Sequence, residues 1–196
     1  RTFGDYGDSI FVPFLKKELQ NASRLDIVWD MYLESSLKNS TREKCGLGER
    51  MKVKESARVP KGWANFLRNN CNKEELFHLL SRKSINWLTD VEKEVFSTDG
   101  FGILTNLISD TQELAPCNHE EANTTRMMVH IVDGVKRGHS RIMIRTVDSD
   151  VVVLAVVTVL QLEEDGLEEL WVHLGTGRNH QYIACHKIIA SLGKLC

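Results

Sequence analysis

The fold is decided by residues 141–160, which read RIMIRTVDSDVVVLAVVTVL. The alternation of side chains along 141–147 predicts a β-strand. The valine-rich stretch 151–160 fits a buried strand by propensity and is ambiguous by period. We predict a buried helix there, because a strand has just ended and Asp148, Ser149 and Asp150 are residues that cap helix starts. A strand that feeds directly into a helix indicates an α/β fold.

Further strands and helices alternate on either side of this stretch. Strands are predicted at 25–29, ending on Asp30, at 169–174, closed by Gly175, and at 94–97. Apolar spacing predicts helices at 9–19 and 120–136. A third helix is expected to begin at Asn72, because Asn72 followed by Glu75 has the spacing of a variant capping box. This order is typical of an α/β layer fold.

Composition bounds the class of protein. The chain has 196 residues, of which 42% are hydrophobic and 27% charged, so we expect a soluble domain with a real core. The formal net charge of −2 argues against nucleic-acid binding by bulk charge and leaves room for a local basic patch. Five scattered cysteines without a C-x-x-C motif, and no secretory pattern at the start, predict a reducing intracellular setting, the nucleus included.

Residues 38–62 form such a basic patch in the sequence. They hold eight basic and three acidic side chains, a net charge of +5, and are punctuated by Gly46, Gly48, Pro60 and Gly62. We predict a mobile basic loop or arch.

Acidic residues follow two of the predicted strands. Asp30 ends one strand, and Asp148 and Asp150 follow another. Ligands of open α/β sheets collect at the carboxyl ends of strands, so these carboxylates would converge if the strands were parallel neighbours. Glu120 and Glu121, at the start of the preceding helix, would add a further contribution. The alternative is that Asp148 and Asp150 cap a helix and that both glutamates complement its dipole.

The chain also resembles a widespread group of uncharacterised animal proteins from multi-copy, mobile-element-like reading frames. The resemblance is carried by VWD at 28–30, SLK at 36–38, TREK at 41–44, HEEA at 119–122 and RTVDSDVVVL at 145–154. It covers nearly the whole chain, including 170–177 and a final helix at 184–193. The group is similar to PIN-like and flap-endonuclease-like domains.

The resemblance implies a single PIN-like α/β domain over 1–196, with a mainly parallel sheet flanked by helices and a basic arch-like insertion at 38–62. It implies hydrolysis of phosphodiester bonds in single-stranded or flapped DNA or RNA by an endo- or exonuclease that uses Mg²⁺ or Mn²⁺. The implied catalytic residues are Asp30, Glu121, Asp148 and Asp150. The implied metal ligands are these four and Glu120. The implied nucleic-acid contacts are Lys38, Arg42, Lys44, Arg50, Lys52 and Lys54.

A second interpretation stays open. The group's pattern reads H-E-E-A-D-T-R, whereas this chain carries Asn123 in place of the aspartate and one additional residue before Arg126. The nuclease pattern also needs an aspartate on a strand that would lie before Arg1, and the group usually continues past Cys196 into a glycine- and aspartate-containing turn, so we expect the chain to be a fragment truncated at both ends. The alternative function is therefore a degenerate, non-catalytic PIN-like domain that binds nucleic acid or a protein partner.

Overall fold

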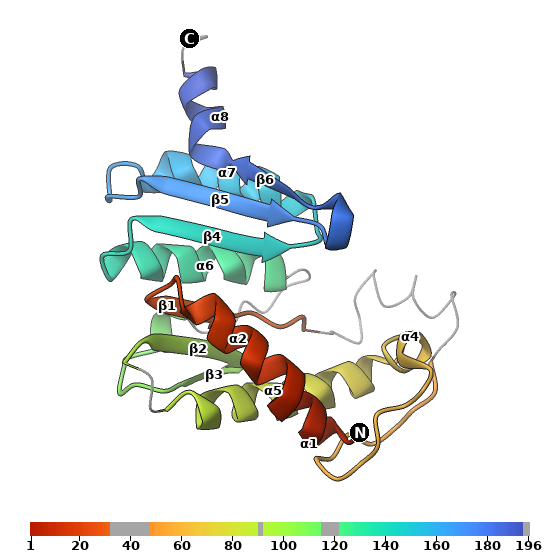
Figure 1. Cartoon of the computed structure of the whole chain (residues 1–196). Coiled ribbons are helices and arrows are strands. Elements are labelled where there is room, and N and C mark those ends of the chain that lie inside the picture. The colour runs from red at the N-terminus through yellow and green to blue at the C-terminus, as the bar shows by residue number, and fades with distance from the viewer. Residues whose placement is uncertain (32–47, 90–91, 115–121, 194–196) are drawn as a thin grey trace. The chain divides into compact units, whose positions relative to one another are not determined.

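The structure is a computed structural model that describes residues 1–31, 48–89, 92–114 and 122–193 (Figure 1). The chain divides into two compact units, Arg1–Glu120 and Glu121–Cys196. Each unit contains a three-stranded mixed sheet flanked by helices, which confirms the α/β class. Whether the units form one PIN-like domain stays a prediction. Within the described ranges, no helix has the length and apolar character needed to cross a bilayer.

The first unit opens with one continuous helical run. Its elements, in chain order, are α1 (Phe3–Tyr6), the π-helical turn η1 (Gly7–Phe11), α2 (Val12–Leu19), β1 (Arg24–Ile27), α4 (Trp63–Phe66), α5 (Asn70–Trp87), β2 (Glu94–Asp99), β3 (Gly102–Thr105) and the 3₁₀ turn η2 (Gln112–Leu114). The run starts earlier than the predicted 9–19, because Thr2 and Asp5 form a capping box. The absence of a side chain at Gly7 leaves room for Lys83, since a Cβ at Gly7 would lie 2.6 Å from Lys83 Cδ.

The sheet of the first unit is mixed, with one parallel and one antiparallel strand pair. β1 pairs with β2 in parallel, and β2 pairs with β3 in antiparallel. The expected mainly parallel sheet is therefore not found in this unit, because the Gly100 turn, with a φ of 57°, returns the chain at once into an antiparallel neighbour. Helix α2 and the C-terminal end of α5 pack on this sheet in one buried cluster, formed by Leu15, Leu19, Val95 and the α5 C-cap residue Leu88.

The start of α5 differs from its prediction. The N-cap is Asn69, whose Oδ1 accepts the Asn72 N–H at 3.3 Å, so Asn72 lies inside the first turn. The Asn72 side chain is 0% exposed and holds the segment before the helix in place. Its Oδ1 accepts the Met51 N–H at 2.9 Å, and its Nδ2 donates to the carbonyls of Glu49 and Phe66 at 2.8 and 3.0 Å. A buried amide with every bond made fixes one conformation.

The second unit follows the predicted strand–helix–strand order. Its elements are α6 (Ala122–Lys136), β4 (Arg141–Thr146), α7 (Asp150–Leu162), β5 (Glu169–Leu174), the 3₁₀ turn η3 (Gly177–Asn179), β6 (Gln181–Ala184) and α8 (Cys185–Leu192). The strands predicted at 141–147 and 169–174 and the helix at 151–160 are confirmed. Strand β6 was not predicted, because Gly175 and Gly177, with φ of 90° and 61°, form a short hairpin.

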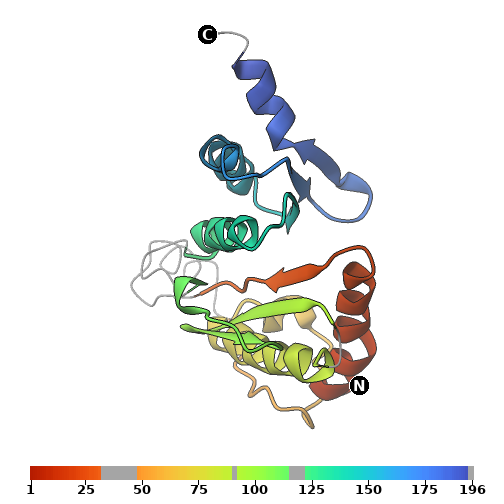
Figure 2. The same ribbon diagram turned by 90° about the vertical axis from the view of Figure 1, so that its left-hand side faces the viewer.

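Both α6 and α7 lie on one side of the second sheet, as Figure 2 shows. β4 pairs with β5 in parallel and β5 with β6 in antiparallel, so this sheet is also mixed. The side chains of Ile144, Leu170 and Val172 join Ile131 and Val151 in one buried cluster. Because side chains alternate along a strand, the intervening residues of β4, β5 and β6 occupy the opposite face.

Replacement of Asn72 tests the network at the start of α5. Asn72→Ala leaves the Met51 N–H and the Glu49 and Phe66 carbonyls without their partner, so we expect it to lower the free energy of unfolding by about 3 kcal/mol. Urea unfolding followed by tryptophan fluorescence reports on this unit, which contains Trp29, Trp63 and Trp87. The control is Asn86→Ala at an exposed position of the same helix, with an effect below about 0.5 kcal/mol. Equal losses in the two variants would contradict the assigned role.

Candidate functional site

Asp148 and Asp150 lie between the end of β4 and the start of α7. The Asp148 N–H donates to Thr146 Oγ1 at 3.1 Å, and Asp148 Oδ1 accepts the Asp150 N–H at 3.0 Å. Ser149, the N-cap residue of α7, makes no side-chain cap bond. Asp148 therefore satisfies the helix start through one oxygen, which is the capping role considered for it from the sequence. Asp150 is exposed in the first turn of α7, where a negative charge complements the helix dipole.

The neighbouring turn at the end of β5 closes on the same edge of the sheet. Thr146 pairs with Leu174, and the Gly175 N–H donates to the Thr146 carbonyl at 2.9 Å. A Cβ at Gly175 would lie 2.5 Å from the Asn179 carbonyl oxygen, so only glycine fits this turn. Since β4 and β5 are parallel, the Asp148 segment and the 175–179 turn share the carboxyl edge at which α/β sheets bind ligands.

Asp30 lies in the first unit, where its neighbour Trp29 holds the chain after β1. The Trp29 N–H donates to Thr98 Oγ1 at 2.9 Å, and its indole Nε1–H donates to Ser81 Oγ at 2.6 Å. The indole also stacks on Phe77, with ring centroids 4.5 Å apart. The position of Asp30 after a strand was predicted from the sequence, but the contacts of Trp29 that hold the chain there were not. Asp30 itself is exposed.

A second strand end in the first unit carries a group that the sequence analysis missed. Asp99, the last residue of β2, has a side chain that is 11% exposed and contacts His78 Nδ1 through Oδ1. Its Oδ2 lies 3.7 Å from Arg82 Nε. His78 and Arg82 are one turn apart on α5, so both reach the same carboxylate. Because β1 and β2 are parallel and end at one edge of this sheet, Asp99 lies at that edge and Asp30 follows β1 there. The only sequence signal was the Asp99-Gly100 turn.

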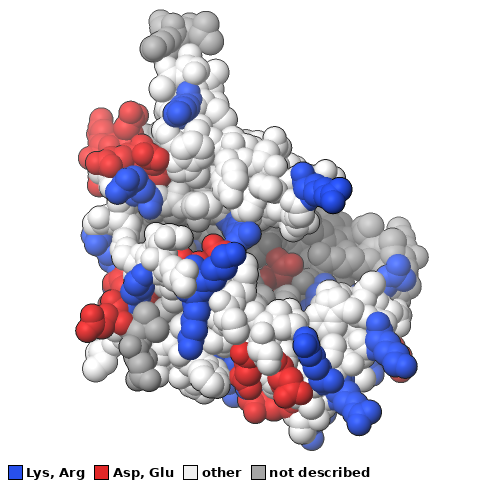
Figure 3. Space-filling model, viewed as in Figure 1, with Lys and Arg blue, Asp and Glu red and all other residues white. Residues whose placement is uncertain are grey.

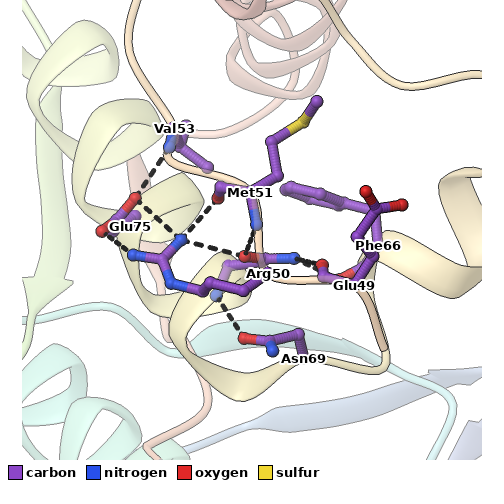
Figure 4. A network of polar contacts seen from close by, with 8 residues as sticks. Glu49, Arg50, Met51, Val53, Phe66, Asn69 and Glu75 are labelled. Carbon is purple, nitrogen blue, oxygen red and sulfur yellow. Dashed lines mark hydrogen bonds and ion pairs between the residues drawn. The ribbon is translucent and has the colours of Figure 1, made fainter. Parts of the chain in front are cut away.

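The basic segment is described only from residue 48 onward, and Lys38, Arg42 and Lys44 lie outside the described residues. Arg50 pairs with the Glu75 carboxylate and donates to Asn72 Oδ1 at 3.0 Å (Figure 4). The Val53 N–H donates to Glu75 Oε2 at 2.7 Å. Lys52 and Lys54 are exposed. Arg50 therefore fastens the segment to α5, and the expected arch is not confirmed over 48–62.

These contacts shift the pKa of both partners in the ion pair. Partial burial acts to raise the pKa of Glu75, but the hydrogen bonds from Arg50 and the Val53 N–H, with the charges of Arg50 and Lys52, lower it overall. The hydrogen bond to Glu75 raises the pKa of Arg50. The pair therefore stays ionised at neutral pH.

The expected metal ligands are divided between the two units. Glu120 and Glu121 lie outside the described residues, while Asp30 follows a strand of the first sheet and Asp148 one of the second. In the ranges that the structure describes, no three His, Cys, Asp or Glu side chains are grouped so as to hold a metal ion. The carboxylate donors themselves suit Mg²⁺ or Mn²⁺. Convergence of all five on one ion stays a prediction.

No protein-family model, no curated protein and no solved structure matches this chain. The likeness to PIN-like domains therefore stays a prediction from the sequence motifs. The structure contributes two sheet edges with carboxylates, one at the ends of β1 and β2 and one at the end of β4.

The lowered pKa of Glu75 has a consequence for stability at acid pH. A carboxylate whose folded-state pKa lies below its ordinary value of 4.5 stabilises the fold above that pH, and the contribution is lost as pH falls through the folded-state pKa. We expect Glu75→Gln to be less stable than the parent at pH 7, with a difference that shrinks below about pH 4.5.

The measurement is the free energy of unfolding by urea at pH 7 and at pH 3.5. Glu92→Gln, at an exposed position of the same unit, is the matched control and should show no such pH-dependent difference. A deficit in Glu75→Gln that is the same at both values of pH would refute the electrostatic account.

Proposed function

We propose that the chain is a PIN-like nuclease domain that hydrolyses phosphodiester bonds in DNA or RNA with Mg²⁺ or Mn²⁺. The observation that supports this most directly is the position of Asp148 and Asp150 at the carboxyl edge of the β4–β5 parallel pair. Among the described residues, Asp148 Oδ2 and the Asp150 carboxylate have no hydrogen bond, so both are open to a cation. A nuclear location would go with such a substrate.

In this proposal each side chain has a separate part. Asp148 and Asp150 would hold the ion, and Asp30, Glu120 and Glu121 would be further ligands. The bound ion would activate a water molecule and stabilise the developing charge on the leaving oxygen. The hydrogen bond from the Asp150 N–H keeps the Asp148 carboxylate in one orientation, as hydrogen bonds to metal ligands commonly do. Lys38 and Arg42 would steady the phosphate.

The second candidate is a non-catalytic module that binds single-stranded or flapped nucleic acid. The capping bond of Asp148 favours it, because that bond accounts for the residue without any metal. Asn123, in place of an expected aspartate, favours it too. Binding by such a module would survive chelation of metal ions and would fall with salt, since lysine and arginine contacts to phosphates release counterions.

Asparagine substitutions separate the chemistry of the carboxylates from their part in folding. Asn in Asp148→Asn retains an Oδ1 that accepts the Asp150 N–H, so the helix start is kept while the charge is lost. We expect Asp148→Asn and Asp150→Asn each to lower Mn²⁺-dependent cleavage of a labelled flapped oligonucleotide by at least about 100-fold. Their free energies of unfolding should stay within about 1 kcal/mol of the parent.

Asp165→Asn is the matched control, because it removes the same charge from an exposed position in the turn after α7. It should cleave like the parent. Cleavage by Asp148→Asn and Asp150→Asn at the rate of the parent would show that the proposed mechanism is wrong. A parent that binds the oligonucleotide in EDTA and never cleaves it would establish the second candidate instead.

A further inference from the structure

Three rings pack together at the hairpin between β5 and β6. His173 on β5 stands opposite Tyr182 on β6, and the two rings are stacked, with centroids 4.5 Å apart and an interplanar angle of 13°. His180 meets both edge-on, at 5.0 Å from His173 and 5.7 Å from Tyr182. His173 is 7% exposed under this cover, whereas Tyr182 remains 57% exposed. The stack thus presents a flat tyrosine ring to solvent on a rigid base.

The rings lie on the face of the second sheet opposite the packed helices. Ile183 and Val172 point into the core with α6 and α7, so Tyr182 and His173 point away from it. Arg145 on β4 is in register with His173. A row of one cation and two stacked rings therefore crosses the three strands, and it ends on β4 just before the segment of Asp148 and Asp150.

Charge on this face is complementary to a phosphate chain. Arg141 and Arg145 occupy two of the three β4 positions on this face, with the exposed Met143 between them, and both arginines are exposed. Lys187 Nζ lies 5.8 Å from the Trp171 ring centroid. The carboxylate of Glu169, on the same face, accepts the Trp171 indole N–H at 2.7 Å. In Figure 3 acidic side chains gather over the turn between α7 and β5, while the hairpin end of the sheet carries a basic side chain.

We infer that Tyr182, supported by His173 and His180, is a base-stacking subsite for single-stranded nucleic acid, and that Arg145, beyond His173 on β4, contacts a phosphate of the same strand. A base of any sequence offers a flat π-face to a tyrosine ring, and an arginine at the other end of the same row can pair with a phosphate farther along the strand. The inference rests on the proposed function in taking nucleic acid as the ligand. It does not depend on the hydrolysis step, because the subsite contains no metal ligand.

Binding to fluorescein-labelled 12-nucleotide single strands, DNA and RNA, tests the subsite in the full chain with EDTA present. We expect Tyr182→Leu, which keeps an apolar side chain but removes the ring, to weaken binding at least about five-fold, and Tyr182→Phe to bind within about two-fold of the parent. Arg145→Gln should reduce the slope of log K against log salt by about 0.7, the loss of one phosphate contact.

Two controls guard against a general effect on the fold. Phe101→Leu removes a ring that is 63% exposed in the first unit and should leave binding unchanged. An abasic strand of the same length tests stacking in the unaltered protein, and the parent should bind it at least about five-fold more weakly than the normal strand. This second measurement stands even if Tyr182→Leu does not fold.

The outcomes for the subsite and for hydrolysis are separate. Parent-like binding by folded Tyr182→Leu, equal binding of abasic and normal strands, or no binding by the parent would overturn the subsite. Loss of binding in Tyr182→Leu without any Mg²⁺- or Mn²⁺-dependent cleavage by the parent would support the subsite and refute the nuclease. Mg²⁺- or Mn²⁺-dependent cleavage by the parent, together with parent-like binding by Tyr182→Leu, would support the nuclease and refute the subsite.

Discussion

The parallel pairing of β4 with β5 is the constraint on which the second unit depends. Two parallel neighbours must be joined by a crossover, and here α7 carries the chain back along one face of the sheet. The crossover buries the valine-rich side of α7 against Ile144 and Val172. It also places the β4–α7 junction and the β5–β6 hairpin at one edge. The burial of the apolar side of α7 therefore determines where the polar residues at this edge of the sheet lie.

This requirement is also why the second unit was largely predictable. The run 141–160 contains a complete strand and a complete buried helix, and its capping residues lie within the same stretch. Local patterns of that kind need no knowledge of distant residues. The hairpin strand β6 escaped prediction, because Gln181–Ala184 is short and its partner is recognised only through the turn at Gly175. The order of strands within each sheet was equally hidden, since pairing partners are set by tertiary packing.

The first unit was less predictable, because its polar side chains bond across long stretches of sequence. Asn72 is a residue type that commonly caps helices, but here it is buried and accepts the Met51 N–H. Asn69 is the N-cap residue instead. Arg50 looked like a phosphate ligand in a basic segment, yet its guanidinium is paired with Glu75, which is 25 residues away. Spacing along the chain does not reveal such pairs. The anchor of Trp29 on Ser81 and the approach of His78 to Asp99 belong to the same class.

The π-helical turn at Gly7–Phe11 keeps the apolar faces of α1 and α2, the helices before and after it, on the same side of the helical run. The side chains of this run that pack in the two buried clusters of the unit include Phe3, Tyr6, Phe11, Leu15 and Leu19. The step of five from Tyr6 to Phe11 exceeds an α-helical turn by more than one residue, and the wider turn absorbs the surplus. A purely α-helical rod would swing α2 about its axis by about 100°, and Ile10 and Phe14 would replace Phe11 and Leu15 in the core. The one additional residue of the π-helical turn keeps the apolar side chains of α2 on the face that packs in the core. The number of residues in this turn therefore matters to the fold as much as the side chains around it.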